Sequence, residues 1–224
     1  MECQKIMKNI VIMTRKLVIF ILIITTISCE PNQNDIGNYQ EINEIFDRTE
    51  IQDLREIIQF FNTAICTSEN LSNDDVNKCY NQYLKRLNEN LTTEVGLELQ
   101  ISFEDQKAFL EQLNPNTLNQ IWSYEKIWNK TSDTLEIRDY NLGKYMEFLK
   151  EFGKANDKAN KYYENLMSIG VISPSAFADM LINYREYNTE DERIKLLIAI
   201  HYLTINEENY VRKKLKSLEE ANKN

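Results

Sequence analysis

One histidine and four cysteines are chemically the most versatile residues of this 224-residue sequence. Catalysis by a serine or cysteine nucleophile usually needs a histidine base, and a zinc site needs several histidine or cysteine ligands. His201 has no second histidine to work with, and it lies on a helix-period apolar stripe. We therefore expect a core or rim histidine that hydrogen-bonds a neighbour, and we predict no catalytic residue, no metal site and no cofactor.

Carboxylates adjoin one another in three places, and each place has an ordinary explanation. The groups Asp74 and Asp75, residues 190–192, and Glu207 with Glu208 all fall where we expect the first turn of a helix. The helix dipole favours negative charge there. A glycan-cleaving enzyme would instead need two carboxylates that face each other about 5 to 9.5 Å apart. Acid/base chemistry on cell-wall or surface glycans therefore stays open as an alternative function.

An N-terminal leader precedes one of the cysteines. An apolar run from Leu17 to Ile24 follows four basic residues, namely Lys5, Lys8, Arg15 and Lys16. The run is too short for a bilayer span, which takes about 20 residues, and is typical of a signal-peptide core. It ends in Thr26-Ile27-Ser28-Cys29, which resembles the lipobox of a bacterial lipoprotein signal. Thr26 departs from the aliphatic residue that is usual at its position.

The resemblance implies that residues 1–28 are cleaved off and that Cys29 is diacylated through its sulfur. Each acyl chain contributes about 0.8 kcal/mol per buried CH₂, so two or three chains hold a protein durably on a bilayer. The protein would then face the periplasm or the cell surface from a bacterial membrane. The alternatives are an uncleaved anchor helix and an ordinary secretory signal.

Electrostatic attraction is not expected to bind this chain to a membrane. The net charge is −9, and removal of the leader takes away four basic residues and one acidic residue, which leaves −12. An acidic chain is repelled by nucleic acid and by anionic lipid headgroups. The expected partner is therefore a protein, of basic charge, and the expected membrane contact is through lipid.

The lipoprotein assignment also sorts the other cysteines. Cys3 lies in the leader and Cys29 carries the lipid, so Cys66 and Cys79 remain as a pair in an oxidising compartment. We expect a structural disulfide between them that staples a helix–loop–helix corner. A metal site would need further ligands, and a redox-active dithiol usually has a shorter spacing.

The elements that position these residues are predicted to be mostly helical. Five glycines and three prolines are few for a chain of this length, which disfavours all-β and nucleotide-binding folds. Apolar residues recur at helical spacing in several segments, and a shorter helix is also predicted over residues 118–128. The main helical segments are residues 41–66, 76–87, 102–114, 133–169, 174–184, 192–202 and 210–218. At 1.5 Å per residue, the segment 133–169 would make a helix of about 50 Å.

Capping signals support several of these boundaries. Ser72 and Ser102 each precede an aspartate by three residues, and Ser173 precedes a proline. Gly170 has the character of a helix stop, and Thr189 with Glu192 predicts a capping box. One segment differs, because residues 95–103 alternate with strand period. A small two-stranded element with residues 135–137 as the partner is the alternative there.

These patterns predict an all-α fold, an irregular bundle of about six to seven helices with one long central helix. The expected organisation is a leader over residues 1–28, a polar tether over 29–40 and a single helical domain over 41–224. Tyrosine suits recognition surfaces because it offers a large contact area at low entropy cost. Five tyrosines are candidates for a binding surface: Tyr124, Tyr140, Tyr184, Tyr187 and Tyr210.

A chain with no recognisable catalytic group is more readily a binding protein than an enzyme. We therefore expect a noncatalytic envelope protein that binds another protein, either a toxin that it neutralises or a surface component. A structural or assembly role in an envelope complex is a further alternative. The basic run Arg212-Lys213-Lys214-Leu215-Lys216 is expected to be a solvated helix face, with a docking patch as its other interpretation.

Overall fold

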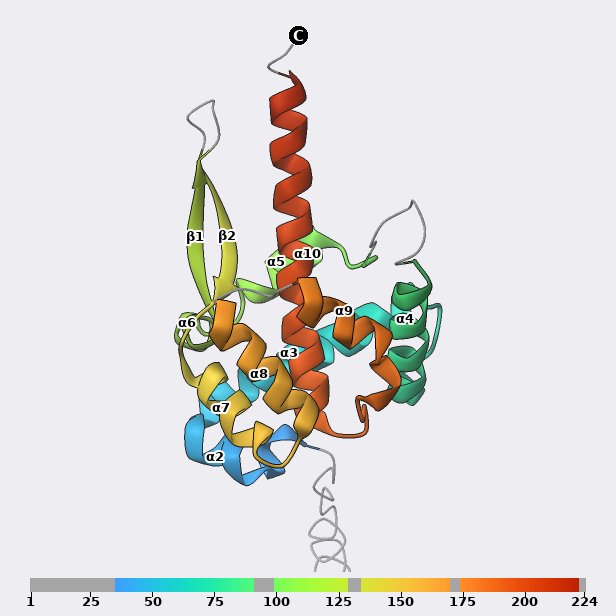
Figure 1. The fold of residues 1–224 in the computed structure, drawn as a ribbon, viewed down its shortest axis with the longest axis vertical. Helices are drawn as coiled ribbons and strands as arrows, with labels where there is room; N and C mark the ends of the chain where they lie inside the picture. Colours follow the sequence, from blue (N-terminus) through green and yellow to red (C-terminus); the bar gives the residue numbers. More distant parts are fainter. Residues whose placement is uncertain (1–34, 91–98, 129–133, 170–173, 222–224) are drawn as a thin grey trace, which may run out of the picture. The chain divides into compact units, whose positions relative to one another are not determined.

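The computed structural model describes residues 35–90, 99–128, 134–169 and 174–221, and these residues form an all-α fold with one small hairpin (Figure 1). The predicted fold class is therefore confirmed, including the minor two-stranded element. Residues Asn34–Asn224 belong to one compact unit. The predicted leader, the lipobox-like segment that ends at Cys29, the predicted helix stop at Gly170 and the predicted cap at Ser173 lie outside the described residues.

The folded body begins earlier than the predicted end of the tether. The 3-10 helix η1 (Ile36–Asn38) buries Ile36 in the core, and Asp35 forms an ion pair with Arg55 in which oxygen and nitrogen lie 2.6 Å apart. The Arg55 guanidinium lowers the pKa of Asp35 through this hydrogen bond. Residues 35–40 thus belong to the folded body and not to the predicted tether.

The predicted helix 41–66 is two helices, α2 (Gln40–Ile45) and α3 (Arg48–Ser68). A capping box separates them, because the Asp47 side chain accepts hydrogen bonds from the first turn of α3 and the Glu50 side chain accepts one from the backbone of Asp47. This pairing stabilises a helix start, so α3 begins afresh at Arg48. The apolar spacing continues across this break, so the spacing alone predicted a single helix.

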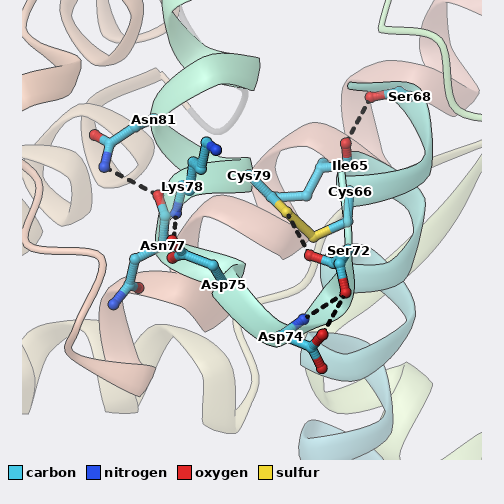
Figure 2. The surroundings of a disulfide bond; sticks show 10 residues. All are labelled: Ile65, Cys66, Ser68, Ser72, Asp74, Asp75, Asn77, Lys78, Cys79 and Asn81. Carbon is cyan, nitrogen blue, oxygen red and sulfur yellow. Dashed lines mark hydrogen bonds between the residues drawn. A yellow bond between two sulfur atoms is a disulfide. The ribbon is translucent and has the colours of Figure 1, made fainter. Parts of the chain in front are cut away.

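A disulfide joins Cys66 in α3 to Cys79 in α4 (Val76–Asn90), the pair that the sequence indicated (Figure 2). Their Cα atoms lie 4.9 Å apart, and both side chains are fully buried. Between them, Ser72 caps the short 3-10 helix η2 (Asn73–Asp75) by accepting a hydrogen bond from the backbone of Asp74. The bond therefore ties α3 to α4 across a tight corner.

Removing this disulfide is expected to destabilise the fold. The two cysteines are 13 residues apart, and a closed loop near this length restricts the unfolded chain by about 3 kcal/mol in the chain-entropy model. We expect the double variant Cys66→Ser/Cys79→Ser to lose about 3 kcal/mol of unfolding free energy in urea titrations. A reductant should lower the stability of the native chain to the same level and leave the variant unchanged. A native chain insensitive to reductant would contradict this prediction.

The hairpin lies where the sequence predicted a helix. After α5 (Phe103–Leu110) and α6 (Pro115–Ile121), strand β1 (Trp122–Trp128) pairs antiparallel with β2 (Thr134–Tyr140). Residues 95–98 lie outside the described residues, and 99–102 are irregular before α5 begins. The segment 135–137 is therefore a strand, as the alternative assignment predicted. It pairs with β1, whereas the predicted partner was residues 95–103. Ser102 does cap α5, as predicted.

The stripe 133–169 is not one long helix. Its first residues form β2, and the rest divides into α7 (Lys144–Gly153) and α8 (Asp157–Ile169). Gly143 precedes α7 where a Cβ atom would lie 2.6 Å from the carbonyl oxygen of Gln120. Gly153 ends α7 where a Cβ atom would lie 2.9 Å from the Cα of Asn160. Both glycines thus permit close backbone contacts at the breaks.

The long central helix is instead α10 (Glu192–Ala221), which follows α9 (Pro174–Ile182) and the 3-10 helix η3 (Tyr184–Glu186). Its 30 residues span about 45 Å and replace the two helices predicted over 192–218. No glycine or proline interrupts this segment. At its start the cap is Asp191, which accepts a hydrogen bond from the backbone of Arg193, rather than Thr189.

Burial divides α10 into two parts. Every residue from Ile194 to Glu207 is buried, whereas most of the residues beyond Glu207 are exposed. Figure 1 shows this second part projecting from the helical body beside the hairpin. Within the described ranges, none of the helices combines the length and the apolar character that crossing a membrane requires.

Candidate binding groove

The hairpin, α5 and the projecting part of α10 enclose a hollow of about 380 Å³, which we call the aromatic groove. Three aromatic, six charged and one aliphatic side chain line it, and they come from segments that are distant in the sequence. These residues are Phe103, Glu104, Lys107, Glu111, Tyr124, Arg138, Glu207, Tyr210, Val211 and Lys214. Ligand sites commonly combine apolar walls with a few converging polar groups in this way.

A buried ion pair forms the inner wall of the groove. Arg138 Nε and Glu207 Oε2 lie 2.8 Å apart, and the two side chains are only 7% and 8% exposed. Burial raises the pKa of Glu207, and the neighbouring Arg138 opposes that shift. The sequence neighbourhood of Glu207 predicts the first turn of a helix, and this prediction is wrong. It lies in the middle of α10, because that helix is continuous.

The hairpin register places aromatic rings around the Arg138 guanidinium. Tyr124 lies directly opposite Arg138 in the two-stranded sheet, and its ring centroid is 5.0 Å from the guanidinium carbon. The Trp122 ring lies 5.7 Å from the same carbon. The Trp122 indole N–H donates to Thr204 Oγ1 at 2.8 Å, which joins β1 to α10. Cation–π contacts and this hydrogen bond thus hold Arg138 in place.

The outer walls are half-exposed aromatic rings. Phe103 and Tyr210 stack with centroids 3.9 Å apart, and the Tyr210 hydroxyl donates to Glu104 Oε1 at 3.4 Å. Tyr124 is 50% exposed and Tyr210 is 37% exposed. A second hollow of about 270 Å³ shares Phe103 and Tyr210 with the groove and extends past Asn209. Together the two hollows offer apolar faces that solvent reaches.

The charges along both hollows are of both signs, and Glu104 has the Tyr210 hydroxyl as its hydrogen-bond donor but no ion-pair partner among the described residues. Lys107 lies 3.9 Å from Glu111 and Arg138 is paired with Glu207, so these four charges compensate each other. Lys214 lines the groove and Lys213 lines the second hollow. Among the described residues neither lysine has an ion-pair partner. Part of the basic run 212–216, which is solvent-exposed at residues 212–214 and 216, therefore also borders the groove.

The structure brings together two of the five candidate tyrosines. Tyr124 and Tyr210 line the aromatic groove, whereas Tyr184 and Tyr187 are buried near η3. Tyr140 is half-buried, and its hydroxyl hydrogen-bonds that of Tyr162 at 3.0 Å. The five tyrosines therefore do not form one binding surface.

Sequence reasoning missed three residues that define the groove: Phe103, Arg138 and Glu207. Phe103 belonged to a segment of strand period, and Arg138 to a segment taken as helix. The available signal was Arg138 itself, a charged residue directly after the alternating Leu135 and Ile137. Arg138 is buried because β2 pairs with β1 and contacts α10. The periodicity of a single segment does not predict either contact.

His201 is a core residue, as predicted. Its side chain is fully buried, and its Nδ1 atom lies 3.0 Å from the Tyr162 hydroxyl. Burial lowers the pKa of His201 to about 3, so the ring is neutral near pH 7. Tyr162 in turn contacts Tyr140, and the three side chains form an internal polar chain that crosses from β2 through α8 to α10.

This burial predicts how His201 responds to pH. Since an unfolded histidine has a pKa near 6.5, the unfolded chain takes up a proton below that pH and the folded chain does not until about pH 3. The contribution of His201 to stability is therefore present above pH 6.5 and lost as the pH falls towards 3. At pH 5 the loss is about 2 kcal/mol.

The measurement is an NMR pH titration of the ring Cε1 proton, which is unambiguous because the chain has one histidine. We expect no shift of this signal between pH 5 and 8 in the folded protein. The same signal in urea should titrate near pH 6.5 and serves as the control. A folded-state midpoint between pH 6 and 7 would contradict the neutral core histidine.

Within the described ranges, no cluster of three or more His, Cys, Asp or Glu side chains could hold a metal ion. Comparison with known proteins adds no family to this description, since no family model, curated protein or solved structure matches the chain.

Proposed function

We propose that this chain is a lipid-anchored protein of the bacterial envelope that binds another protein through the aromatic groove and catalyses no reaction. The observation that carries the proposal is the groove itself, in which the half-exposed Tyr124 lies against a buried arginine and the half-exposed Tyr210 lines the same hollow. Tyrosine and arginine are among the residues that dominate binding energy at protein interfaces. Thr26-Ile27-Ser28-Cys29 supports the anchor, because of its resemblance to a lipobox.

The position of the body limits where such a partner can be. If Cys29 carries the lipid, five residues separate it from Asp35, where the packed body begins. A fully extended chain spans at most about 3.6 Å per residue, so this tether holds Asp35 within about 20 Å of the bilayer surface. The folded body is then held beside the bilayer, and the partner is a molecule of the compartment that this membrane surface faces.

The experiment is site-specific photo-crosslinking from the groove in intact cells. A photoreactive residue replaces Tyr124 or Tyr210 in the full chain, and matched controls carry it at Met167 or Ile182. These control positions are 49% and 62% exposed and do not line the groove. We expect the same protein adduct from both groove positions and its absence from both controls. Adducts from all four positions, or from the controls alone, would contradict the proposal.

One observation favours an enzyme as the second candidate. Glu207 is buried in the groove with a raised pKa, and Glu104 and Glu111 line the same hollow. A general acid in glycan cleavage needs such a raised pKa and a second carboxylate nearby. Incubation of the protein with purified cell-wall glycan tests this candidate. Product formation that Glu104→Gln or Glu111→Gln abolishes would support it, whereas unchanged glycan would leave binding as the function.

A further inference from the structure

The charges that line the two hollows are more evenly balanced than those of the whole chain. The sequence has a net charge of −9, whereas four cations and three carboxylates line the two hollows, and Lys213 and Lys214 have no ion-pair partner among the described residues. Salt screens exposed charges beyond about 8 to 10 Å at physiological ionic strength. The overall charge therefore guides the approach of a partner, but the local charges decide what enters the groove.

Arg138 offers the groove an unused hydrogen-bond donor. Its Nε atom faces Glu207 at 2.8 Å, while its Nη1 atom is buried and has no acceptor. A guanidinium carries five N–H donors, and a buried donor without an acceptor is unfavourable. The half-exposed Tyr124 ring lies against this guanidinium, so it is the side chain whose movement would admit an incoming acceptor.

We propose that the aromatic groove binds an acidic peptide segment, with one carboxylate directed at Arg138 and Lys214. This inference rests on the proposed binding function and names the chemistry of the segment. Arginine forms strong charge-assisted hydrogen bonds to carboxylates, and Lys214 supplies the second positive charge that Glu207 does not already neutralise. Apolar side chains of the segment pack against the stacked Phe103 and Tyr210 rings.

The rest of the surface argues against a polyanion as the occupant. Nucleic acids and anionic bilayers present many phosphates over a wide area, and they would meet the acidic remainder of the chain. Glu104 and Glu111 also line the groove. A peptide with one or two carboxylates beside apolar residues fits both the cations and the aromatic walls.

The test is a titration of the full-length, acylated chain in detergent micelles, in the background Trp128→Phe so that Trp122 is the single tryptophan. The probes are acetyl-Glu-Leu-Phe-Glu-amide and its uncharged match acetyl-Gln-Leu-Phe-Gln-amide. The readout is the indole N–H signal of Trp122, whose ring adjoins Arg138. We expect the glutamate peptide to bind about tenfold more tightly, and salt to weaken that preference.

Matched lysine variants locate the interaction. Lys214 and Lys216 both lack an ion-pair partner among the described residues, but only Lys214 lines the groove. We expect Lys214→Gln to weaken the glutamate peptide about threefold to tenfold, and Lys216→Gln to leave its affinity unchanged. Both side chains are solvent-exposed, so neither substitution should affect folding.

Three outcomes would overturn the inference. Equal binding of the two peptides would show a groove that binds peptides without carboxylate recognition, in which case the proposed function survives. No binding of either peptide would remove the acidic segment as the occupant, and the crosslinks from Tyr124 and Tyr210 would still decide the function separately. A Trp122 response to inorganic phosphate but to neither peptide would assign the cations to a phosphate-bearing ligand instead.

Discussion

Replacing Arg138 with methionine is expected to lower the free energy of unfolding by about 3 to 5 kcal/mol at pH 7. The substitution leaves the Glu207 carboxylate 8% exposed and without its ion-pair partner. Removal of one member of a buried pair costs more than the pair contributes, because the remaining charge has lost its hydration and gains no compensation. Methionine retains an unbranched apolar stem against Trp122 and Tyr124, so the change is mainly electrostatic.

The pH dependence of this loss has a definite sign. Burial already raises the pKa of Glu207, and removal of Arg138 takes away the group that opposes the shift. In the Arg138→Met variant the folded chain therefore binds a proton more readily than the unfolded chain does. Stability falls as the pH rises through the interval between the two pKa values. Urea titrations should show a smaller deficit at pH 5 than at pH 7.

Two controls separate charge from packing. The double variant Arg138→Met/Glu207→Gln removes both charges and should recover most of the lost stability. Arg212→Met removes an arginine from an exposed ion pair with Glu208, in which the arginine side chain is 69% exposed. Exposed helix pairs contribute only about 0.3 to 0.5 kcal/mol. An Arg138→Met loss no larger than that of Arg212→Met would refute a strongly desolvated pair.

The second large effect concerns the anchor. Replacing Cys29 with alanine is expected to release the protein from the membrane fraction almost completely, because the proposed acyl chains would have no sulfur to attach to. Two chains contribute about 0.8 kcal/mol for each buried CH₂, and the acidic chain has no electrostatic attraction to anionic lipids that would replace them. Cell fractionation followed by immunoblotting measures the release, and metabolic labelling with a fatty acid detects the modification.

Cys3→Ala is the matched control, because Cys3 lies in the segment that the proposed cleavage removes. We expect this variant to remain on the membrane and to keep its fatty-acid label. Retention of Cys29→Ala on the membrane, or an intact leader in the mass of the native protein, would disprove the anchor. The compartment inferred from it would then need another basis, although the groove would be unaffected.

The helical part of the fold was predictable because helix signals are local. Apolar spacing within one segment and the cap at Ser102 can each be inferred from short stretches of sequence, whereas the pairing of Cys66 with Cys79 was inferred from the roles predicted for the other two cysteines. The same locality explains the errors over helix ends. A capping box at Asp47 and close packing at Gly153 interrupt stripes whose apolar spacing runs on without a break.

The hairpin was mispredicted for a different reason. The apolar residues Leu118, Ile121, Trp122 and Trp128 have a spacing that a helix accommodates, and the segment 135–137 fits either structure. A strand is stable only when another segment supplies the partners for its backbone hydrogen bonds. The choice between helix and strand for these residues was thus made by pairing, which neither segment encodes alone.

The sequence by itself determined a predominantly helical chain of acidic charge with a cysteine pair that the fold joins, and its resemblance to a lipoprotein signal predicts the leader. Tertiary structure decided that Tyr124 and Tyr210 share a groove, that Tyr187 is buried, and that Glu207 meets Arg138. The physical reason is the range of the interactions. Helix propensity and capping act within a few residues, whereas the partner of a buried charge comes from a distant segment that only folding brings near.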